Sequence, residues 1–172
     1  MVEARGAAAM ARHIDEGRRR IVLRASPSAA VVDGLPTLLA GQVGRTLVVA
    51  EHERVPTVLS GLRAALGAPA VDGLDGDARV TVGNYERVGL NARFIASDAF
   101  GLVVLLPHGP QNARSAAAVA ERFHPAAMLQ VLGTGPSAFV PDFSATASDL
   151  PPPAGAQDNL AGNVVPFPGR AA

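Results

Sequence analysis

Short β-prone runs alternate along this chain with segments whose apolar residues recur at helical spacing. The runs predict strands at residues 21–24, 46–50, 79–82, 102–106 and 128–132. Apolar residues three or four positions apart predict helices at residues 7–19, 29–40, 55–66 and 114–123. Strands that are apolar on both sides and separated by helices are typical of a parallel sheet covered on both faces. The pattern therefore predicts an α/β fold of three layers, with a mostly parallel sheet between two layers of helices.

The C-terminal part of the chain has a different character. From about Ser137 the apolar runs stop, and Pro151, Pro152 and Pro153 are followed by scattered Gly, Asn and Pro residues. Such a segment buries too little apolar surface to offset the entropy of ordering it. We expect a folded domain at residues 1–143 and a Pro/Gly-rich, mostly disordered tail at residues 144–172.

Composition narrows the chemistry more than it narrows the fold. The chain has no Cys, which excludes disulfides, thiolate metal sites and a Cys nucleophile. All 15 of its Lys+Arg residues are Arg, so Schiff-base chemistry and a phosphate-binding lysine are excluded. The formal net charge of +0 argues against a basic footprint over the whole surface, although a local patch stays open. No apolar run approaches the roughly 18 residues of a membrane span, and residues 1–20 lack the apolar core of a signal peptide. We expect a cytoplasmic protein with no membrane partner.

The order of the segments resembles the first RecA-like domain of superfamily 2 helicases, in particular their type III restriction/DEAH-like branch. The resemblance covers Ile14 to Pro136. It begins with a basic stretch and a strand at residues 18–24 and continues with an apolar strand and polar turn at residues 46–54. It ends with the segments at residues 80–87, 100–105 and 132–136. The resemblance implies a P-loop NTPase fold of the RecA-like type. The other interpretation is that any Val-rich parallel α/β protein would align as well.

The residues that bind and hydrolyse ATP in that family are absent at the matching positions. The segment in the place of the P-loop contains Ser26, Pro27, Ser28, Ala30 and Val31, with Val31 where the family has its lysine. Leu106 and Pro107 stand where the Walker B acidic pair is expected, and Gly133-Thr134-Gly135 replaces the Thr-Ala-Thr motif. The resemblance therefore implies a degenerate domain without catalytic residues, which we expect to bind no cofactor and no metal.

Other candidate site residues follow the predicted strands. Loops at the carboxyl ends of parallel strands form the binding crevice of such sheets. The candidate crevice loops contain Gly83, Asn84, His108, Gly133, Thr134 and Gly135. Ordinary turns at these places are the alternative. The four His residues are far apart in sequence and show no metal-ligand spacing.

The densest positive charge is formed by Arg18, Arg19, Arg20 and Arg24. These arginines are candidates for contacts with a phosphate backbone, and a solvated helix end is the alternative. Three hypotheses for function stay open. The first is an inactive helicase-like domain that binds a protein or a nucleic acid, and the second is a nucleotide-binding or hydrolytic enzyme of another α/β family. The third is a truncated remnant without function.

Overall fold

The computed structural model describes residues 10–24, 30–132 and 135–146, which form a seven-stranded sheet between helices. The strands lie in the order β3-β4-β2-β5-β6-β1-β7, and every neighbouring pair is parallel. Their bounds are β1 Arg20–Arg24, β2 Thr46–Ala50, β3 Val71–Gly73, β4 Val80–Asn84, β5 Leu102–Leu105, β6 Ala127–Leu132 and β7 Phe143–Thr146. The helices are α2 Ala30–Ala40, α3 Val55–Leu66, α4 Tyr85–Asn91 and α5 Ala113–Arg122, and residues 10–15 are also helical. Single 3-10 turns lie at η1 His52–Arg54, η2 Ala68–Ala70, η3 Ala92–Phe94 and η4 Pro110–Asn112.

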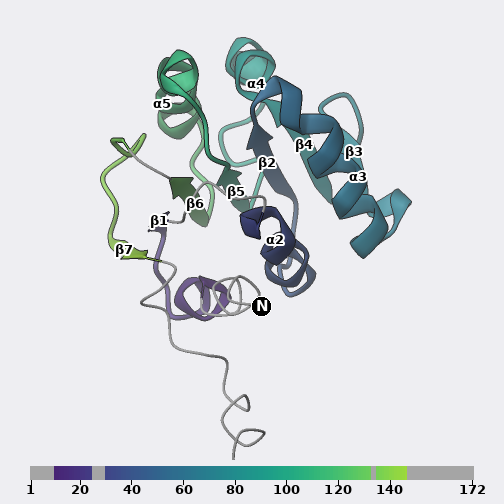
Figure 1. Cartoon of the computed structure of the whole chain (residues 1–172), viewed down its shortest axis with the longest axis horizontal. Coiled ribbons are helices and arrows are strands. Elements are labelled where there is room, and N and C mark those ends of the chain that lie inside the picture. Colours follow the sequence, from purple (N-terminus) through teal and green to yellow (C-terminus); the bar gives the residue numbers. More distant parts are fainter. Residues whose placement is uncertain (1–9, 25–29, 133–134, 147–172) are drawn as a thin grey trace, which may run out of the picture.

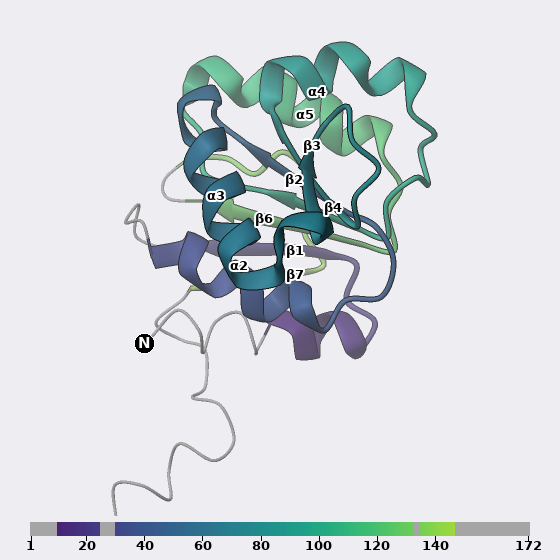
Figure 2. The ribbon, with the colours of Figure 1, turned by 90° about the vertical axis from the view of Figure 1, so that its right-hand side faces the viewer.

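Two hydrophobic cores lie on opposite faces of the sheet, because successive residues of a strand point to opposite sides. On one face, the helix at residues 10–15, α2 and α3 pack with Val48 and Val104. On the other face, α4 and α5 pack with Val49 and Val103. Figures 1 and 2 show the sheet between these two layers. We call the two sides the α2–α3 face and the α4–α5 face. The fold class predicted from the sequence, a three-layer α/β fold with a parallel sheet, is confirmed.

One helix was missed by the sequence analysis, which predicted a strand ending at residue 82 followed by a turn. The strand β4 continues to Asn84, and α4 begins at the next residue. The Asn84 side chain accepts a hydrogen bond from the backbone N–H of Arg87 at 2.8 Å, which caps the helix. Tyr85 and Val88, three positions apart, are both buried on the inner side of α4. The N-cap residue and this spacing were the signals that could have predicted the helix.

The two ends of the described chain also differ from the prediction. The helix predicted at residues 7–19 is described from residue 10 and ends at residue 15, and Gly17 follows with a φ of 88°. β7 pairs with β1, so the sheet extends across the expected boundary at residue 144 into the first residues of the predicted tail. The rest of that tail lies outside the described residues. In the part of the chain that the structure describes, no helix has the length and apolar character needed to cross a membrane.

Candidate functional site

The carboxyl ends of the strands form one edge of the sheet, which we call the carboxyl edge. After β2 the chain enters α3 on one face, whereas after the neighbouring strands β4 and β5 it enters α4 and α5 on the other. Neighbouring strands whose connections leave on opposite faces leave a crevice between those connections, where ligands bind in folds of this kind. The crevice beside β2 brings together Glu51, His52, Asn84 and His108, which follow or end these three strands.

Glu51 joins the loop after β2 to the loop after β5. Its Oε1 accepts hydrogen bonds from the backbone N–H of Gly109 at 2.7 Å and from Gln111 Nε2 at 3.3 Å. Asn112 Nδ2 lies 3.5 Å from the same oxygen. A carboxylate that accepts several N–H donors is a strong local anchor, because hydrogen bonds to a charged acceptor are stronger than those between neutral groups. Glu51 therefore holds the 107–112 loop against the end of β2.

Tyr85 holds the start of the same loop from the buried side. Its side chain is 1% exposed, and its hydroxyl donates a hydrogen bond to the carbonyl of Leu106. Burial raises the pKa of the Tyr85 phenol well above its ordinary value, and the negative charge of Glu51 raises this pKa further. The phenol therefore stays protonated and keeps its role as a donor.

His108 lies beside Tyr85, with ring centroids 4.8 Å apart in an edge-to-face arrangement. Its Nδ1 is 2.9 Å from the carbonyl oxygen of Gly109, and because a carbonyl can only accept, Nδ1 carries the proton. Its Nε2 is buried, and among the described residues it has no hydrogen-bond partner. His108 is therefore the member of this cluster with unused hydrogen-bonding capacity.

Asn84 and His52 complete the cluster. Asn84 Nδ2 lies 3.3 Å from His52 Nδ1, while Asn84 Oδ1 caps α4. His52 is exposed. Most side chains of the cluster are thus bonded to the backbone of the loops and helices around them, and only Asn84 and His52 contact each other through polar atoms. Among residues 10–24, 30–132 and 135–146, no group of three or more His, Cys, Asp or Glu is placed to hold a metal ion.

The end of β5 carries apolar residues at the positions where the resemblance expects the acidic pair. Leu106 is 1% exposed and packs in the core of the α2–α3 face. Pro107 is half-buried. Neither side chain offers an oxygen to a metal ion or to a water molecule.

Several other predicted site residues lie away from this cluster. Gly135 is near the end of β1, where Arg24 Nη1 donates to its carbonyl at 3.1 Å, and its φ of 108° favours glycine. Gly83 is buried in β4, where an added Cβ would lie 2.6 Å from Val88 Cγ2. A glycine is needed here because α4 packs closely against this strand. The backbone of Ala30 and Val31 begins α2, and Ser26, Pro27, Ser28, Gly133 and Thr134 lie outside the described residues.

Three of the four arginines predicted to contact phosphates are consecutive at the start of β1, and the fourth is at the end of this strand. Arg18 lies over the ring of Phe143 at 5.8 Å, and Phe143 packs with the core of the α2–α3 face. Arg20 lies over Phe139 at 5.5 Å, on the α4–α5 face. Arg19 is exposed next to them. Arg24 is at the opposite end of β1, about 13 Å from Arg20 at the usual rise of a strand. Contact of these arginines with a phosphate backbone stays a prediction.

Asn84 and His108 were predicted from the sequence as site residues, whereas Glu51 and Tyr85 were not. Glu51 follows a fully buried strand directly, and Tyr85 is the single tyrosine of the chain. A charged residue at the end of a buried strand was the available signal for Glu51. Nothing in the local sequence of Tyr85 indicates its bond to a residue 21 positions away.

Comparison with known proteins supports the fold but gives no family. No family model matches the chain, and no curated protein matches it. Among solved structures, the chain is similar to the UvsW helicase from bacteriophage T4, with a TM-score of 0.57 and 15% sequence identity. The match covers 70% of this chain and 50% of the UvsW chain, so the chain spans about half the length of that protein. This similarity shows that the chain has a RecA-like α/β fold.

Proposed function

We propose that this chain is a helicase-like domain that does not hydrolyse ATP and that acts by binding a protein or a nucleic acid. The observation that carries the proposal is the end of β5. Leu106 and Pro107 stand where a helicase of this fold needs two carboxylates, one for Mg²⁺ and one for the attacking water. The buried side chain of Leu106 is part of the core, so this end of the strand serves packing instead.

Two further observations support the absence of hydrolysis. The chain has no lysine, so no ammonium group is available to neutralise the β- and γ-phosphates of a bound nucleotide. Arginine is bulkier and does not act as the same compact point charge. Glu51 and Tyr85 also hold the chain at and just before the 107–112 loop. Their polar atoms are used in these hydrogen bonds.

The direct test is phosphate release from ATP by the purified full chain, with and without single-stranded DNA, double-stranded DNA and RNA. We expect no release above that of buffer under any of these conditions. Stimulated release that is lost in the variant Ser26→Ala/Ser28→Ala would contradict the proposal. Release that persists unchanged in this variant would point to a contaminating ATPase, and a second purification route would then remove it.

A second candidate function is favoured by the unpartnered Nε2 of His108 beside the crevice at β2. In this alternative the chain belongs to another class of α/β protein and binds a nucleotide, with an N–H of the base donating to His108 Nε2, which is an acceptor when Nδ1 carries the proton. Calorimetric titration with ATP and ADP separates the two. Heat that is lost in His108→Ala supports the alternative, whereas no heat in the wild type supports the first proposal.

A further inference from the structure

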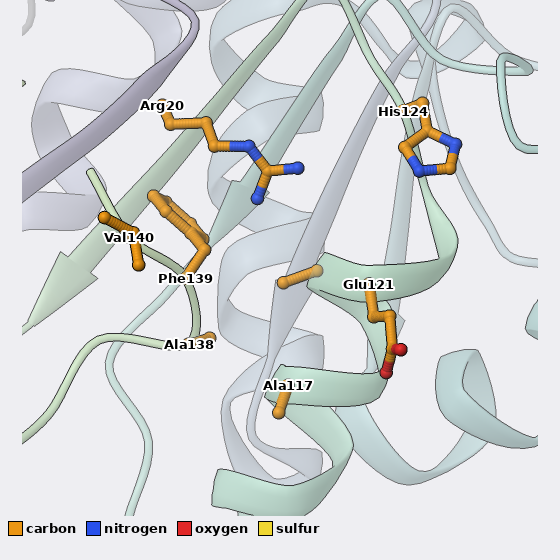
Figure 3. A pocket seen from close by; sticks show the side chains of 8 residues that line it. Arg20, Ala117, Glu121, His124, Ala138, Phe139 and Val140 are labelled. Atoms are coloured by element: carbon orange, nitrogen blue, oxygen red, sulfur yellow. The ribbon is translucent and has the colours of Figure 1, made fainter. Parts of the chain in front are cut away.

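A groove lies on the α4–α5 face, away from the crevice at β2. Its volume is 570 Å³, and its walls are α5 and the connection between β6 and β7 at residues 135–142. Figure 3 shows Arg20 between these two walls. Grooves of this size, from about 300 to 1,000 Å³, hold small ligands or a few side chains of a peptide.

One wall is a single side of α5. Ala117, Ala120 and Glu121 line the groove and are spaced by three and four positions from the first, which places them on one helical side, and His124 follows just after the helix. The alanines leave room above the helix, and Glu121 and His124 are exposed at its end of the groove.

The other wall is apolar. Phe139 is 8% exposed and belongs to the core of this face, while the next residue, Val140, is 86% exposed. Val140 therefore adds exposed apolar surface to the rim of the groove. The connection itself is pinned by Gln130, whose Oε1 accepts the backbone N–H of Ala138 at 2.7 Å.

Arg20 supplies the charge of the groove. Its guanidinium lies over the Phe139 ring at 5.5 Å, and among the described residues no carboxylate lies within ion-pair distance of it. Figure 3 shows this group directed into the space between the walls, with the Glu121 carboxylate turned away from it. The groove thus offers a cation with free donors next to apolar surface.

We propose that this groove binds a short peptide segment of a partner protein that carries a carboxylate and, within a few residues, a large apolar side chain. The carboxylate pairs with Arg20, whose planar guanidinium suits two parallel hydrogen bonds to it. The apolar side chain lies against Ala117, Ala120 and Val140. This inference names the partner class for the binding role proposed above and does not depend on the absence of ATP hydrolysis.

The lining favours a peptide over a nucleic acid. A phosphate backbone calls for several cations, whereas Arg20 is accompanied in the groove by the acidic Glu121. Base stacking requires an open aromatic face, and the Phe139 ring is covered by Arg20.

The test begins with selection of random heptapeptides displayed on phage against the immobilised full chain. We expect enriched peptides to combine Asp or Glu with Leu, Ile, Phe or Val. The best peptide is then synthesised with a fluorescent label, and its affinity is measured by anisotropy. Substitution of Arg20→Glu should weaken binding by about tenfold or more, and exchanging the acidic residue of the peptide for Arg should restore it.

A matched pair of variants tests the place of binding. Ala117→Glu fills the groove, while Ala118→Glu makes the same change at the next, equally exposed position of α5, which does not line it. We expect the first to abolish binding and the second to leave it within about twofold of wild type. Circular dichroism of both variants confirms that each is folded.

Other occupants of the groove give different results. No enrichment, or binding that ignores both Arg20→Glu and Ala117→Glu, overturns the proposal. So does a dimer by light scattering that Ala117→Glu splits, because the occupant is then a second copy. A peptide affinity that rises tenfold in Phe167→Asp would assign the groove to the chain's own C-terminal segment, and DNA binding lost in both groove variants would assign it to nucleic acid. If both variants still bind DNA and no peptide binds, the groove is not the binding site, although the proposal that the chain binds a partner still holds.

Discussion

The two connections on the α4–α5 face contrast with each other. The chain between β5 and β6 forms α5, which covers the sheet with Ala116, Val119 and Phe123 and is entered through a loop anchored by Glu51 and Tyr85. The chain between β6 and β7 is described from residue 135 to residue 142 and forms no helix over those residues. It covers the sheet mainly with Phe139 and is held by the hydrogen bonds of Ala138 to Gln130 and of Asp142 to the backbone of Arg19 and Arg20. A helix closes the core beside it, whereas the irregular connection leaves a groove.

The largest expected difference in stability is between Phe→Ala substitutions made in each of the two connections. Phe123→Ala removes a side chain that is 0% exposed and packs edge-to-face on Phe100, and should cost about 3–5 kcal/mol because an enclosed cavity remains. Phe139→Ala should cost about 2 kcal/mol, since the space it leaves opens into the groove and carries little cavity penalty. Urea unfolding followed by circular dichroism measures both. Equal losses would show that the connection is packed as tightly as α5.

The carboxylates that anchor the two connections give the next comparison. Glu51→Gln weakens the bonds to the 107–112 loop and should cost about 1–2 kcal/mol. Asp142 accepts the backbone N–H groups of Arg19 at 2.9 Å and Arg20 at 3.1 Å, but it is exposed, so Asp142→Asn should cost about 0.5–1 kcal/mol. Glu53→Gln, at an exposed position, serves as the control in the same unfolding assay. A larger loss in Asp142→Asn than in Glu51→Gln would reverse the comparison.

The phenol of Tyr85 makes the stability of the folded chain sensitive to high pH, through the connection that contains α5. Its pKa is raised in the folded chain, so its contribution is complete below the unfolded pKa of about 10 and is lost as the pH rises above it, by about 1.4 kcal/mol per pH unit. Tyr85→Phe should cost about 1 kcal/mol at neutral pH, and this difference from wild type should shrink above pH ~10. Because the chain has one Tyr and no Trp, tyrosinate absorbance reports this group alone. Tyrosinate formation at the ordinary pKa in the folded chain would contradict the burial of Tyr85.

The smallest expected effect concerns Gln130, which is 0% exposed on the interior strand β6. Its Nε2 has no partner among the described residues, so Gln130→Leu removes a buried unpaired donor and also the bond to Ala138. These changes oppose each other, and global stability should stay within about 1 kcal/mol of wild type. Hydrogen exchange at the Ala138 amide should nevertheless accelerate, because the connection loses its pin. Unchanged exchange would mean that Phe139 alone holds the segment in place.

The sequence predicted the parts of the molecule that depend on local pattern. The strand 46–50 and the helix 55–66 were predicted with their observed bounds, because a continuous apolar run and a helical spacing each specify their element alone. β7 was missed because its four residues depend on pairing with β1. For the candidate site, the residues that follow a strand directly could be predicted, whereas those that depend on tertiary contacts could not. Asn84 and His108 are visible as strand-end residues, whereas the bond from Tyr85 to Leu106 exists only once β4 and β5 lie on either side of β2.

The position of β1 between β6 and β7 also determines when this strand can pair during synthesis of the chain. Arg24 meets Gly135 111 positions later, and Arg19 meets Asp142 123 positions later. At about 5–20 residues per second, a ribosome needs roughly 5–20 s to make the intervening hundred or so residues. During that interval Ile21, Val22 and Leu23 have been made but lack both neighbouring strands, so β1 enters the sheet only after β6 has been synthesised.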